Sequence, residues 1–125
     1  MIKLLKCMHC GNLVTMVEDK GVPVVCCGEK MTELKPNTED AAQEKHVPVV
    51  EVSGNTVTVK VGSVEHPMTE PHYIAHIFLE TNKGVLRKDL TPSDKPEAVF
   101  ALAEGEVAVA AYEYCNLHGF WMKEL

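Results

Sequence analysis

The residues most able to do chemistry are four histidines and one cysteine that are spread over three short segments. Cys115 and His118 are separated by two residues near the C-terminus, His66 and His72 are six positions apart, and His46 lies upstream of them. Imidazole nitrogens and thiolate sulfur are common ligands of transition metals in proteins. Four imidazoles with one thiolate are too rich in nitrogen for a structural zinc site and too poor in sulfur for an iron–sulfur cluster. The set therefore favours an iron site with redox chemistry.

A second set of candidate ligands consists of four cysteines near the N-terminus. Cys7 and Cys10 are separated by two residues, and Cys26 and Cys27 are adjacent and follow fifteen residues later. Four thiolates in a tetrahedron suit zinc or a single iron, and the ligand type leaves both metals open. Adjacent side chains point apart on an extended backbone, so this pair needs a sharp turn, which Gly28 permits. The alternative interpretation is a redox disulfide or unligated thiols.

Composition and charge limit the classes of function. The chain has 125 residues, of which 46% are apolar and 24% charged, as in a soluble globular protein of one ordinary domain or two small ones. A net charge of −6 with only 12 Lys and Arg residues argues against nucleic-acid binding. The same charge repels an anionic substrate at long range, so anion chemistry would need a local positive group.

Cysteine usage and the distribution of apolar residues indicate the compartment. Five cysteines are an odd number, and residues 1–6 do not form a convincing signal peptide. Metal ligation therefore explains the cysteines better than a disulfide framework does. No apolar run is long enough to span a bilayer, because Glu104 and Glu106 interrupt the longest candidate. We expect a cytoplasmic protein that does not bind membranes.

The elements that must position these residues fall into two parts. Residues 1–35 contain the four cysteines and are too few to bury a sufficient core, so a bound metal must supply the missing stability. Within them, residues 13–16 and 22–25 are predicted to form a hairpin around residues 19–21. Residues 36–45 are polar and are predicted to be a linker. Residues 46–125 are predicted to be an antiparallel sandwich or barrel, with strands at 47–52, 56–61, 73–80, 84–88, 98–102 and 107–114.

Three motifs of the second part resemble the superoxide reductase family in order and spacing. They are Glu44-Lys45-His46-Val47-Pro48-Val49, His66-Pro67-Met68 followed by His72, and Glu113-Tyr114-Cys115-Asn116-Leu117-His118-Gly119. The cysteine unit resembles a desulforedoxin domain, and both parts together resemble desulfoferrodoxin, the two-iron form of this family. The resemblance covers essentially the whole chain. It implies a mainly β protein in which a small, metal-stapled desulforedoxin-like domain precedes an immunoglobulin-like antiparallel β-sandwich.

The resemblance also implies roles for single residues. It places His46, His66, His72 and His118 in the equatorial plane of a mononuclear iron, with Cys115 axial and the sixth position open. Lys45 lies beside the open position, and Glu44 occupies it when the iron is ferric. The implied reaction is the one-electron reduction of superoxide to hydrogen peroxide. The implied protein is a homodimer with two iron ions per chain, zinc being possible at Cys7, Cys10, Cys26 and Cys27, and an external donor such as rubredoxin re-reduces it.

Two alternatives from other classes remain open. One is a two-iron electron carrier without catalysis, and the other is a zinc-ribbon module whose β-domain binds a protein. His76 is a departure from the family pattern, which tends to have an aromatic residue there. In a strand, His76 faces the same side as His72. We expect it to have a structural role, because the implied ligand set is already complete.

Overall fold

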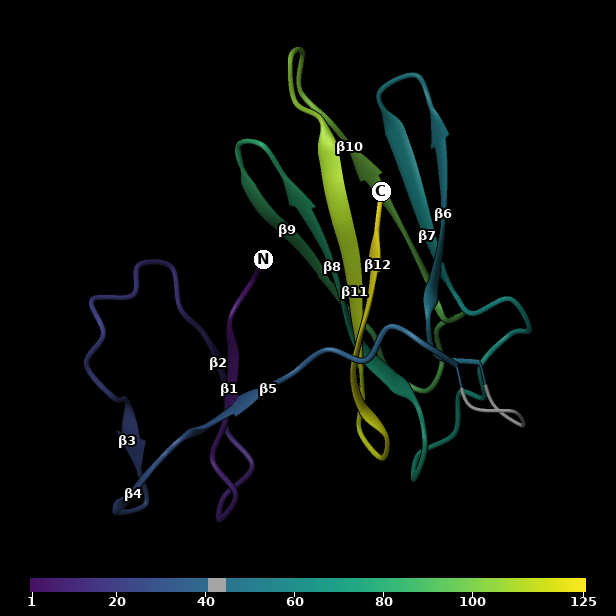
Figure 1. Ribbon diagram of the computed structural model, residues 1–125. Coiled ribbons are helices and arrows are strands. Elements are labelled where there is room, and N and C mark those ends of the chain that lie inside the picture. Colours follow the sequence, from purple (N-terminus) through teal and green to yellow (C-terminus); the bar gives the residue numbers. More distant parts are fainter. Residues whose placement is uncertain (41–44) are drawn as a thin grey trace. The chain divides into compact units, whose positions relative to one another are not determined.

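The computed structural model describes residues 1–40 and 45–125, and every regular element assigned in these two ranges is a β-strand. No helix in the described ranges has the length and apolarity that a membrane crossing requires. The chain divides into two compact units, Met1–Lys35 and Pro36–Leu125. Both are visible in Figure 1, where strands β1 to β5 belong to the first unit and β6 to β12 to the second.

The first unit is a three-stranded sheet with a two-stranded hairpin. Its central strand β1 (Leu4–Lys6) pairs with β2 (Leu13–Thr15) on one side and β5 (Thr32–Leu34) on the other. The small hairpin joins β3 (Val25–Cys26) to β4 (Glu29–Lys30). The predicted hairpin between residues 13–16 and 22–25 is wrong, because β2 pairs with β1 instead. The bend between them is closed by the Asp19 side chain, whose Oδ1 accepts the Gly21 N–H at 2.8 Å.

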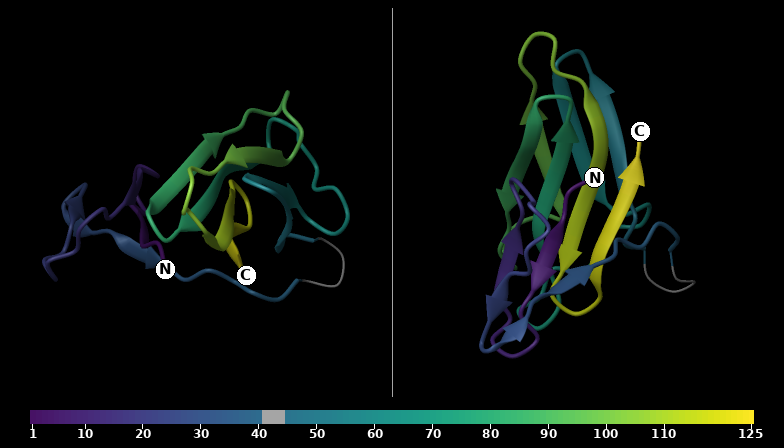
Figure 2. Two further views of the ribbon diagram at one scale, coloured as in Figure 1. Left: turned by 90° about the horizontal axis from the view of Figure 1, so that it is seen from above. Right: turned by 60° about the vertical axis from the view of Figure 1, so that its left-hand side comes forward.

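The second unit is a sandwich of two antiparallel sheets, as predicted. One sheet has the strand order β10-β7-β6 and the other β12-β11-β8-β9, and Figure 2 shows both from two further directions. Six strands coincide closely with the predicted ones, whereas β12 was not predicted. The strands are β6 (Pro48–Ser53), β7 (Thr56–Val61), β8 (Ile74–Thr81), β9 (Gly84–Asp89), β10 (Glu97–Ala101), β11 (Ala108–Cys115) and β12 (Gly119–Glu124).

The core lies between the two sheets and follows from the alternation of apolar and polar residues. In β7, Val57, Val59 and Val61 are fully buried, whereas the residues between them are more exposed. A period of two places alternate side chains on one face of a strand, so this face packs on the opposite sheet. The buried cluster also contains Ile74, Ile77, Leu79, Ala98, Phe100, Leu102, Ala111 and Cys115. One candidate metal ligand, Cys115, is therefore part of the hydrophobic core.

Candidate metal centres

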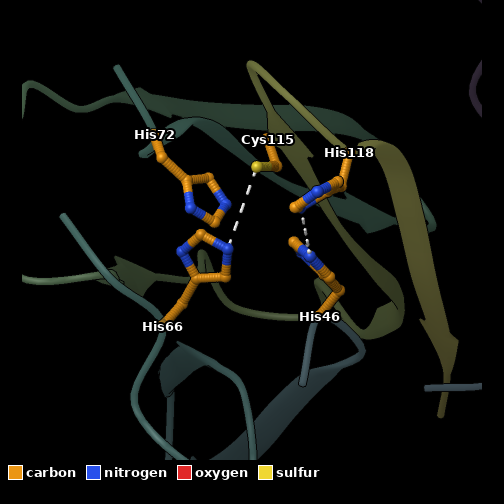
Figure 3. A group of neighbouring side chains, drawn as sticks. All are labelled: His46, His66, His72, Cys115 and His118. Carbon is orange, nitrogen blue, oxygen red and sulfur yellow. Dashed lines mark hydrogen bonds between the residues drawn. The ribbon is translucent and has the colours of Figure 1, made fainter. Parts of the chain in front are cut away.

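The five candidate ligands of the second unit meet in space. The ligand atoms of His46, His66, His72, Cys115 and His118 all lie within 4.8 Å of one another. Figure 3 shows the four rings around a common centre, with the sulfur of Cys115 directed to the same place. His46 precedes β6, His66 and His72 lie between β7 and β8, and Cys115 and His118 flank the β11–β12 turn. Because these strands are antiparallel, all five positions fall at one end of the sandwich. We call this group the histidine–cysteine site.

The four imidazoles form a closed cycle. Ring centroids of neighbours are 4.6 Å apart for His46 and His66, 4.7 Å for His66 and His72, 4.8 Å for His72 and His118, and 5.1 Å for His118 and His46. Three of these neighbouring pairs are nearly perpendicular, with interplanar angles of 76°, 81° and 89°. Such a cycle is the arrangement expected of four equatorial ligands around one metal.

Distances between ligand atoms agree with a shared metal ion. His46 Nε2 lies 3.2 Å from His118 Nδ1, close to the roughly 3 Å edge of a square whose metal–nitrogen bonds are about 2.1 Å. Cys115 Sγ lies 3.8 Å from His66 Nε2.

His66 Nδ1 lies 2.7 Å from its acceptor, the Pro67 carbonyl oxygen. This contact places the ring proton on Nδ1 and leaves the Nε2 lone pair for a metal.

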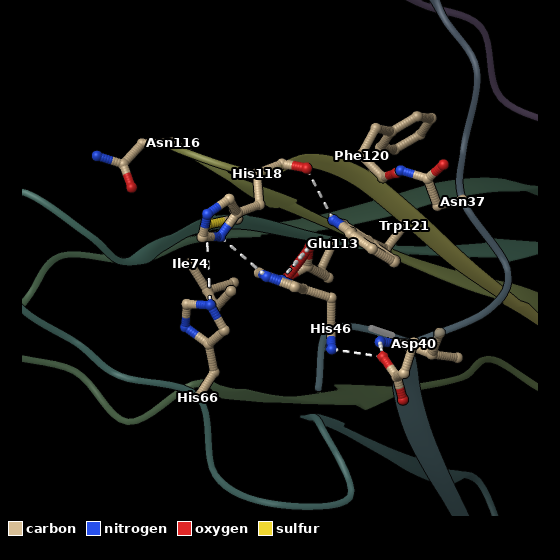
Figure 4. Close-up of polar contacts among 12 residues, drawn as sticks. Asn37, Asp40, His46, His66, Ile74, Glu113, Asn116, His118, Phe120 and Trp121 are labelled. Atoms are coloured by element: carbon tan, nitrogen blue, oxygen red, sulfur yellow. Dashed lines mark hydrogen bonds and ion pairs between the residues drawn. The ribbon is translucent and has the colours of Figure 1, made fainter. Parts of the chain in front are cut away.

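A buried carboxylate stands behind the histidine–cysteine site. Glu113 is fully buried, and its Oε1 lies 3.8 Å from His46 Nδ1 (Figure 4). His46 is only 2% exposed. Burying a carboxylate far from positive charge is costly, and a cation held by the adjacent ring would offset this cost. The negative charge of this carboxylate also favours a proton on Nδ1, the nitrogen that faces it, and so favours Nε2 as the metal-binding nitrogen of His46.

Asn116 connects two of the ligand segments. Its Oδ1 accepts the Tyr73 N–H at 2.8 Å, and its Nδ2 donates to the Pro71 carbonyl at 3.1 Å. The segment that carries His72 is thereby attached to the turn that carries Cys115 and His118. A reciprocal pair of backbone hydrogen bonds between Thr69 and His72, of 2.9 and 3.0 Å, closes the other side of that segment.

The segment around His46 is held by a carboxylate and by a close backbone contact. Asp40 Oδ1 accepts the N–H groups of His46 and Val47 at 2.6 and 2.8 Å. Lys45 is half-buried, and a Cβ built on Gly62 would lie 2.8 Å from its carbonyl oxygen. Position 62 therefore accepts only glycine without movement of this backbone. Glu44 lies outside the described residues.

A β-bulge in strand β8 lies opposite Cys115. Tyr114 pairs with His76, whereas Cys115 pairs with Ile74, so β8 has one extra residue at this point. Bulges of this kind re-aim side chains and are frequent beside active sites. His76 does not join the ligand group, because its Nδ1 is hydrogen-bonded to Asp89 Oδ1 at 2.8 Å on the neighbouring strand. This contact agrees with the structural role expected for His76.

The four N-terminal cysteines form a second group, the four-cysteine site. The sulfurs of Cys7, Cys10, Cys26 and Cys27 lie within 4.8 Å of one another, and those of Cys10 and Cys26 are 3.6 Å apart. Metal–sulfur bonds of about 2.3 Å give a tetrahedron with an edge near 3.8 Å. The sharp turn needed by the adjacent pair is present, since Cys27 and Gly28 have φ of 53° and 76°.

Electrostatics at the four-cysteine site also favour a cation. Hydrogen bonds from the backbone N–H groups of Cys10 and His9 lower the pKa of the Cys7 thiol to about 6. Hydrogen bonding to the neighbouring sulfurs, with Cys10 first, raises the pKa of Cys27 to about 12. Four thiols this close cannot all ionise at neutral pH on their own. A bound metal cation ionises its thiol ligands and removes this repulsion.

Three residues near the histidine–cysteine site were missed by sequence reasoning. They are Glu113, Asn116 and Trp121. Glu113 shares a strand face with Cys115, two positions on, and this spacing is a signal that could have pointed to it. The contacts of Asn116 with Tyr73 and Pro71, and the stack of Trp121 on His46, join segments far apart in the sequence, so spacing along the chain gives no comparable signal.

Fold and sites together define a class: a two-unit β metalloprotein with a four-cysteine site and a sandwich that carries a site of four histidines and one cysteine. The family model described as Desulfoferrodoxin matches residues 38–124. A desulfoferrodoxin of Syntrophotalea carbinolica is 49% identical over 123 residues, which cover 98% of this chain and 96% of that protein. The chain belongs to the desulfoferrodoxin family.

Solved structures agree with this assignment. The superoxide reductase of Treponema pallidum matches with a TM-score of 0.86 and 40% identity, over 99% of this chain and 98% of that one. A superoxide reductase (1Fe-SOR) of Giardia intestinalis matches with a TM-score of 0.55 and 37% identity. The second match covers 66% of this chain and all of the other, so the Giardia protein corresponds to only part of this chain.

Proposed function

We propose that the chain is a superoxide reductase, which reduces superoxide to hydrogen peroxide at one iron ion held by the histidine–cysteine site. The observation that carries this proposal is the closed cycle of four imidazoles with a thiolate aimed at the same centre. Membership of the desulfoferrodoxin family and the similarity to named superoxide reductases support it. The reaction consumes one electron and two protons for each superoxide.

The donor set suits iron and leaves room for a substrate. Neutral imidazoles are good ligands for iron, and five ligands leave one of six octahedral positions for a small anion. A ferrous iron held there would supply the single electron, and the Cys115 thiolate would increase electron density on it. The Pro67 carbonyl holds the imidazole of His66 in the tautomer that such an ion needs, and the Glu113 carboxylate places a negative charge 3.8 Å from His46 Nδ1.

Lys45 supplies the positive charge that the acidic chain otherwise lacks at this place. It directly precedes His46, and its backbone is confined by Gly62. A cationic side chain beside the open position attracts superoxide against the net charge of −6 and orients water for proton delivery. We propose that Glu44, the preceding residue, occupies the open position after oxidation and keeps other anions out of it.

The remaining assignments extend the same proposal. Residues 1–35 bind a second iron, or zinc, at the four-cysteine site, residues 36–45 act as a linker that ends with Glu44 and Lys45, and residues 46–125 hold the catalytic iron. A small redox protein of the rubredoxin type returns the electron, and the chain works in the cytoplasm as a homodimer. The family assignment and the two metal-ligand groups support the two metal sites.

Product analysis tests the proposed function. The iron-loaded protein with a chemical reductant is exposed to a steady source of superoxide, and hydrogen peroxide and oxygen are measured. We expect one peroxide per superoxide and no oxygen. One oxygen for every two superoxide ions would instead identify a dismutase. A protein whose second iron does not react with superoxide and binds neither azide nor cyanide would be an electron carrier.

A further inference from the structure

The single tryptophan of the chain lies against the histidine–cysteine site. Trp121 is in β12, directly opposite Glu113 of β11, and only 9% of its surface is exposed. Because residues directly opposite on an antiparallel pair share a face of the sheet, its indole lies on the side of Glu113 and of the ligands. None of the roles proposed above involves Trp121.

The first contact of Trp121 is with a ligand ring. The indole stacks on His46 with ring centroids 4.6 Å apart and an interplanar angle of 13°. A parallel stack restricts rotation of the imidazole out of its plane, while Glu113 lies beside its Nδ1. The ring of His46 is thus confined on a face and on an edge by two residues that are opposite each other in one hairpin.

The second contact is with the backbone of another ligand. Trp121 Nε1–H donates to the His118 carbonyl oxygen at 3.0 Å (Figure 4). The indole nitrogen is a donor only, and in a nearly buried position its hydrogen bond is costly to lose. This bond fixes the end of the turn from which the His118 ring projects.

The two ligands that Trp121 contacts are neighbours in the cycle and come from segments far apart in the sequence. His46 Nε2 and His118 Nδ1 are 3.2 Å apart. We propose that Trp121 is a positioning residue that sets the separation of these two nitrogens before the metal binds, and so determines metal affinity. The proposal rests on the proposed function only in taking the five residues as metal ligands.

Ferrous-iron affinity tests this proposal in the full chain with zinc in its four-cysteine site. Equilibrium dialysis without oxygen compares the parent with Trp121→Leu, Trp121→Phe and Phe120→Leu. Phe120 is the matched control, since it is the buried neighbour in β12 and stacks on Tyr112, on the other face of the sheet. Removing a residue that contacts and orients a metal ligand typically weakens metal affinity by roughly 10–100-fold. We expect a loss of ferrous-iron affinity of this size for Trp121→Leu. Trp121→Phe keeps the stack and loses the donor, so its loss is smaller, and Phe120→Leu binds like the parent.

Thermal unfolding of the protein without metal in the histidine–cysteine site separates positioning from general packing. We expect Trp121→Leu and Phe120→Leu to lower the melting temperature to a similar extent, while only the former loses affinity. Equal affinity of Trp121→Leu and the parent, or an equal loss in Phe120→Leu, would overturn the proposal. If Trp121→Leu does not fold, Trp121→Phe decides, and affinity equal to that of the parent is then the overturning result. No superoxide is used, so failure here leaves the proposed activity intact.

Discussion

The chemistry of the histidine–cysteine site depends on which nitrogen each imidazole presents. In neutral imidazole one nitrogen is a donor and the other an acceptor, and the partner of the first decides which is free for a metal. For His66 that partner is the Pro67 carbonyl at 2.7 Å, whereas the Glu113 carboxylate lies 3.8 Å from His46 Nδ1, beyond hydrogen-bond distance. The fold thereby selects the metal-binding nitrogen of His66 before any metal arrives.

Replacement of Lys45 by alanine tests the local positive charge. We expect the second-order rate constant for superoxide to fall by at least about tenfold, and its dependence on ionic strength to weaken, because attraction of the anion is lost. Pulse radiolysis of the iron-loaded variants measures both quantities. Lys45→Arg keeps the charge and should restore much of the rate.

Lys83 provides the matched control for this experiment. It lies in the turn between β8 and β9, at the opposite end of β8 from the ligands. Lys83→Ala changes the net charge by the same amount and should leave the rate close to that of the parent. Equal losses in the two alanine variants would show that net charge, rather than the position of Lys45, controls the rate.

At the scale of elements, the ligands are placed by strand ends and by one hairpin. Cys115 ends β11 and His118 precedes β12, so the register of this hairpin sets their separation. The alternation of β11 places Cys115 on the same face as Glu113, and the bulge in β8 lies opposite it. Asp40 and Gly62 hold the segment before β6, which carries His46. The site is therefore as rigid as the sandwich end that supports it.

Replacement of Gly62 by alanine tests the backbone contact with Lys45. The new Cβ would lie 2.8 Å from the Lys45 carbonyl oxygen and 3.0 Å from its carbonyl carbon, so the backbone must move. We expect a loss of about 1–3 kcal/mol in the free energy of unfolding and weaker iron binding at the histidine–cysteine site. Urea unfolding and equilibrium dialysis measure the two effects. Ser63→Ala, next in the chain, should change neither, and parent-like behaviour of Gly62→Ala would contradict the contact.

The turn after β10 gives a prediction on pH dependence. Glu106 accepts hydrogen bonds from the Thr81 hydroxyl at 2.7 Å and from the Ala103 N–H at 3.0 Å, which hold its pKa below the ordinary 4.5. Because this pKa is lower in the folded than in the unfolded chain, the ionised carboxylate stabilises the fold at any pH above its unfolded-state pKa. This contribution is lost as the pH falls through the pKa of the folded state. Thr81→Val should raise the pKa of Glu106 toward 4.5 without reaching it.

Carbon-detected NMR titration of the Glu106 carboxyl group measures this shift directly. An unchanged pKa of Glu106 in Thr81→Val would show that the Thr81 hydroxyl does not stabilise the carboxylate in solution.

Sequence patterns predicted some elements well and others badly, for physical reasons. Strand β7 has the alternation of a half-buried strand, and it was predicted with its observed bounds. Strand β12 has three consecutive buried residues, Phe120, Trp121 and Met122, so it lacks that alternation and was missed. The predicted N-terminal hairpin was wrong because β2 pairs with β1. Strand β1 has only three residues, which are too few to show a recognisable strand pattern in the sequence. Ligand types and their spacing predicted the five residues of the histidine–cysteine site. They did not predict that Glu113 and Trp121 lie against those ligands.

At the scale of the whole molecule, the two units depend on metal to different degrees. The second unit has a hydrophobic core that extends through both sheets. The first unit has 35 residues, and it exposes large apolar side chains such as Met8, Val17 and Val22. Chains below about 40 residues usually need a metal or disulfides to fold. The sulfurs of its four cysteines lie within 4.8 Å of one another, so a bound metal would supply this stability.

Removal of one thiolate from the four-cysteine site tests this difference. Cys7 is buried, and we expect Cys7→Ser to lose the N-terminal metal and amide-exchange protection throughout residues 1–35. The second unit should keep its iron and its protection. Met8→Ala, an exposed residue in the same loop, is the control and should keep both metals. Loss of protection in both units of Cys7→Ser would contradict independent folding.

The central claim is that the histidine–cysteine site holds a redox iron with Cys115 as a ligand. Metal analysis and visible spectra of the anaerobically purified protein, before and after mild oxidation, test it most directly in the parent and in Cys115→Ser. With zinc in the four-cysteine site of both proteins, we predict iron in the histidine–cysteine site and a thiolate-to-iron absorption band that appears on oxidation of the parent and is absent from the variant. A site that takes only zinc after iron reconstitution, or a band that survives in Cys115→Ser, would contradict the account.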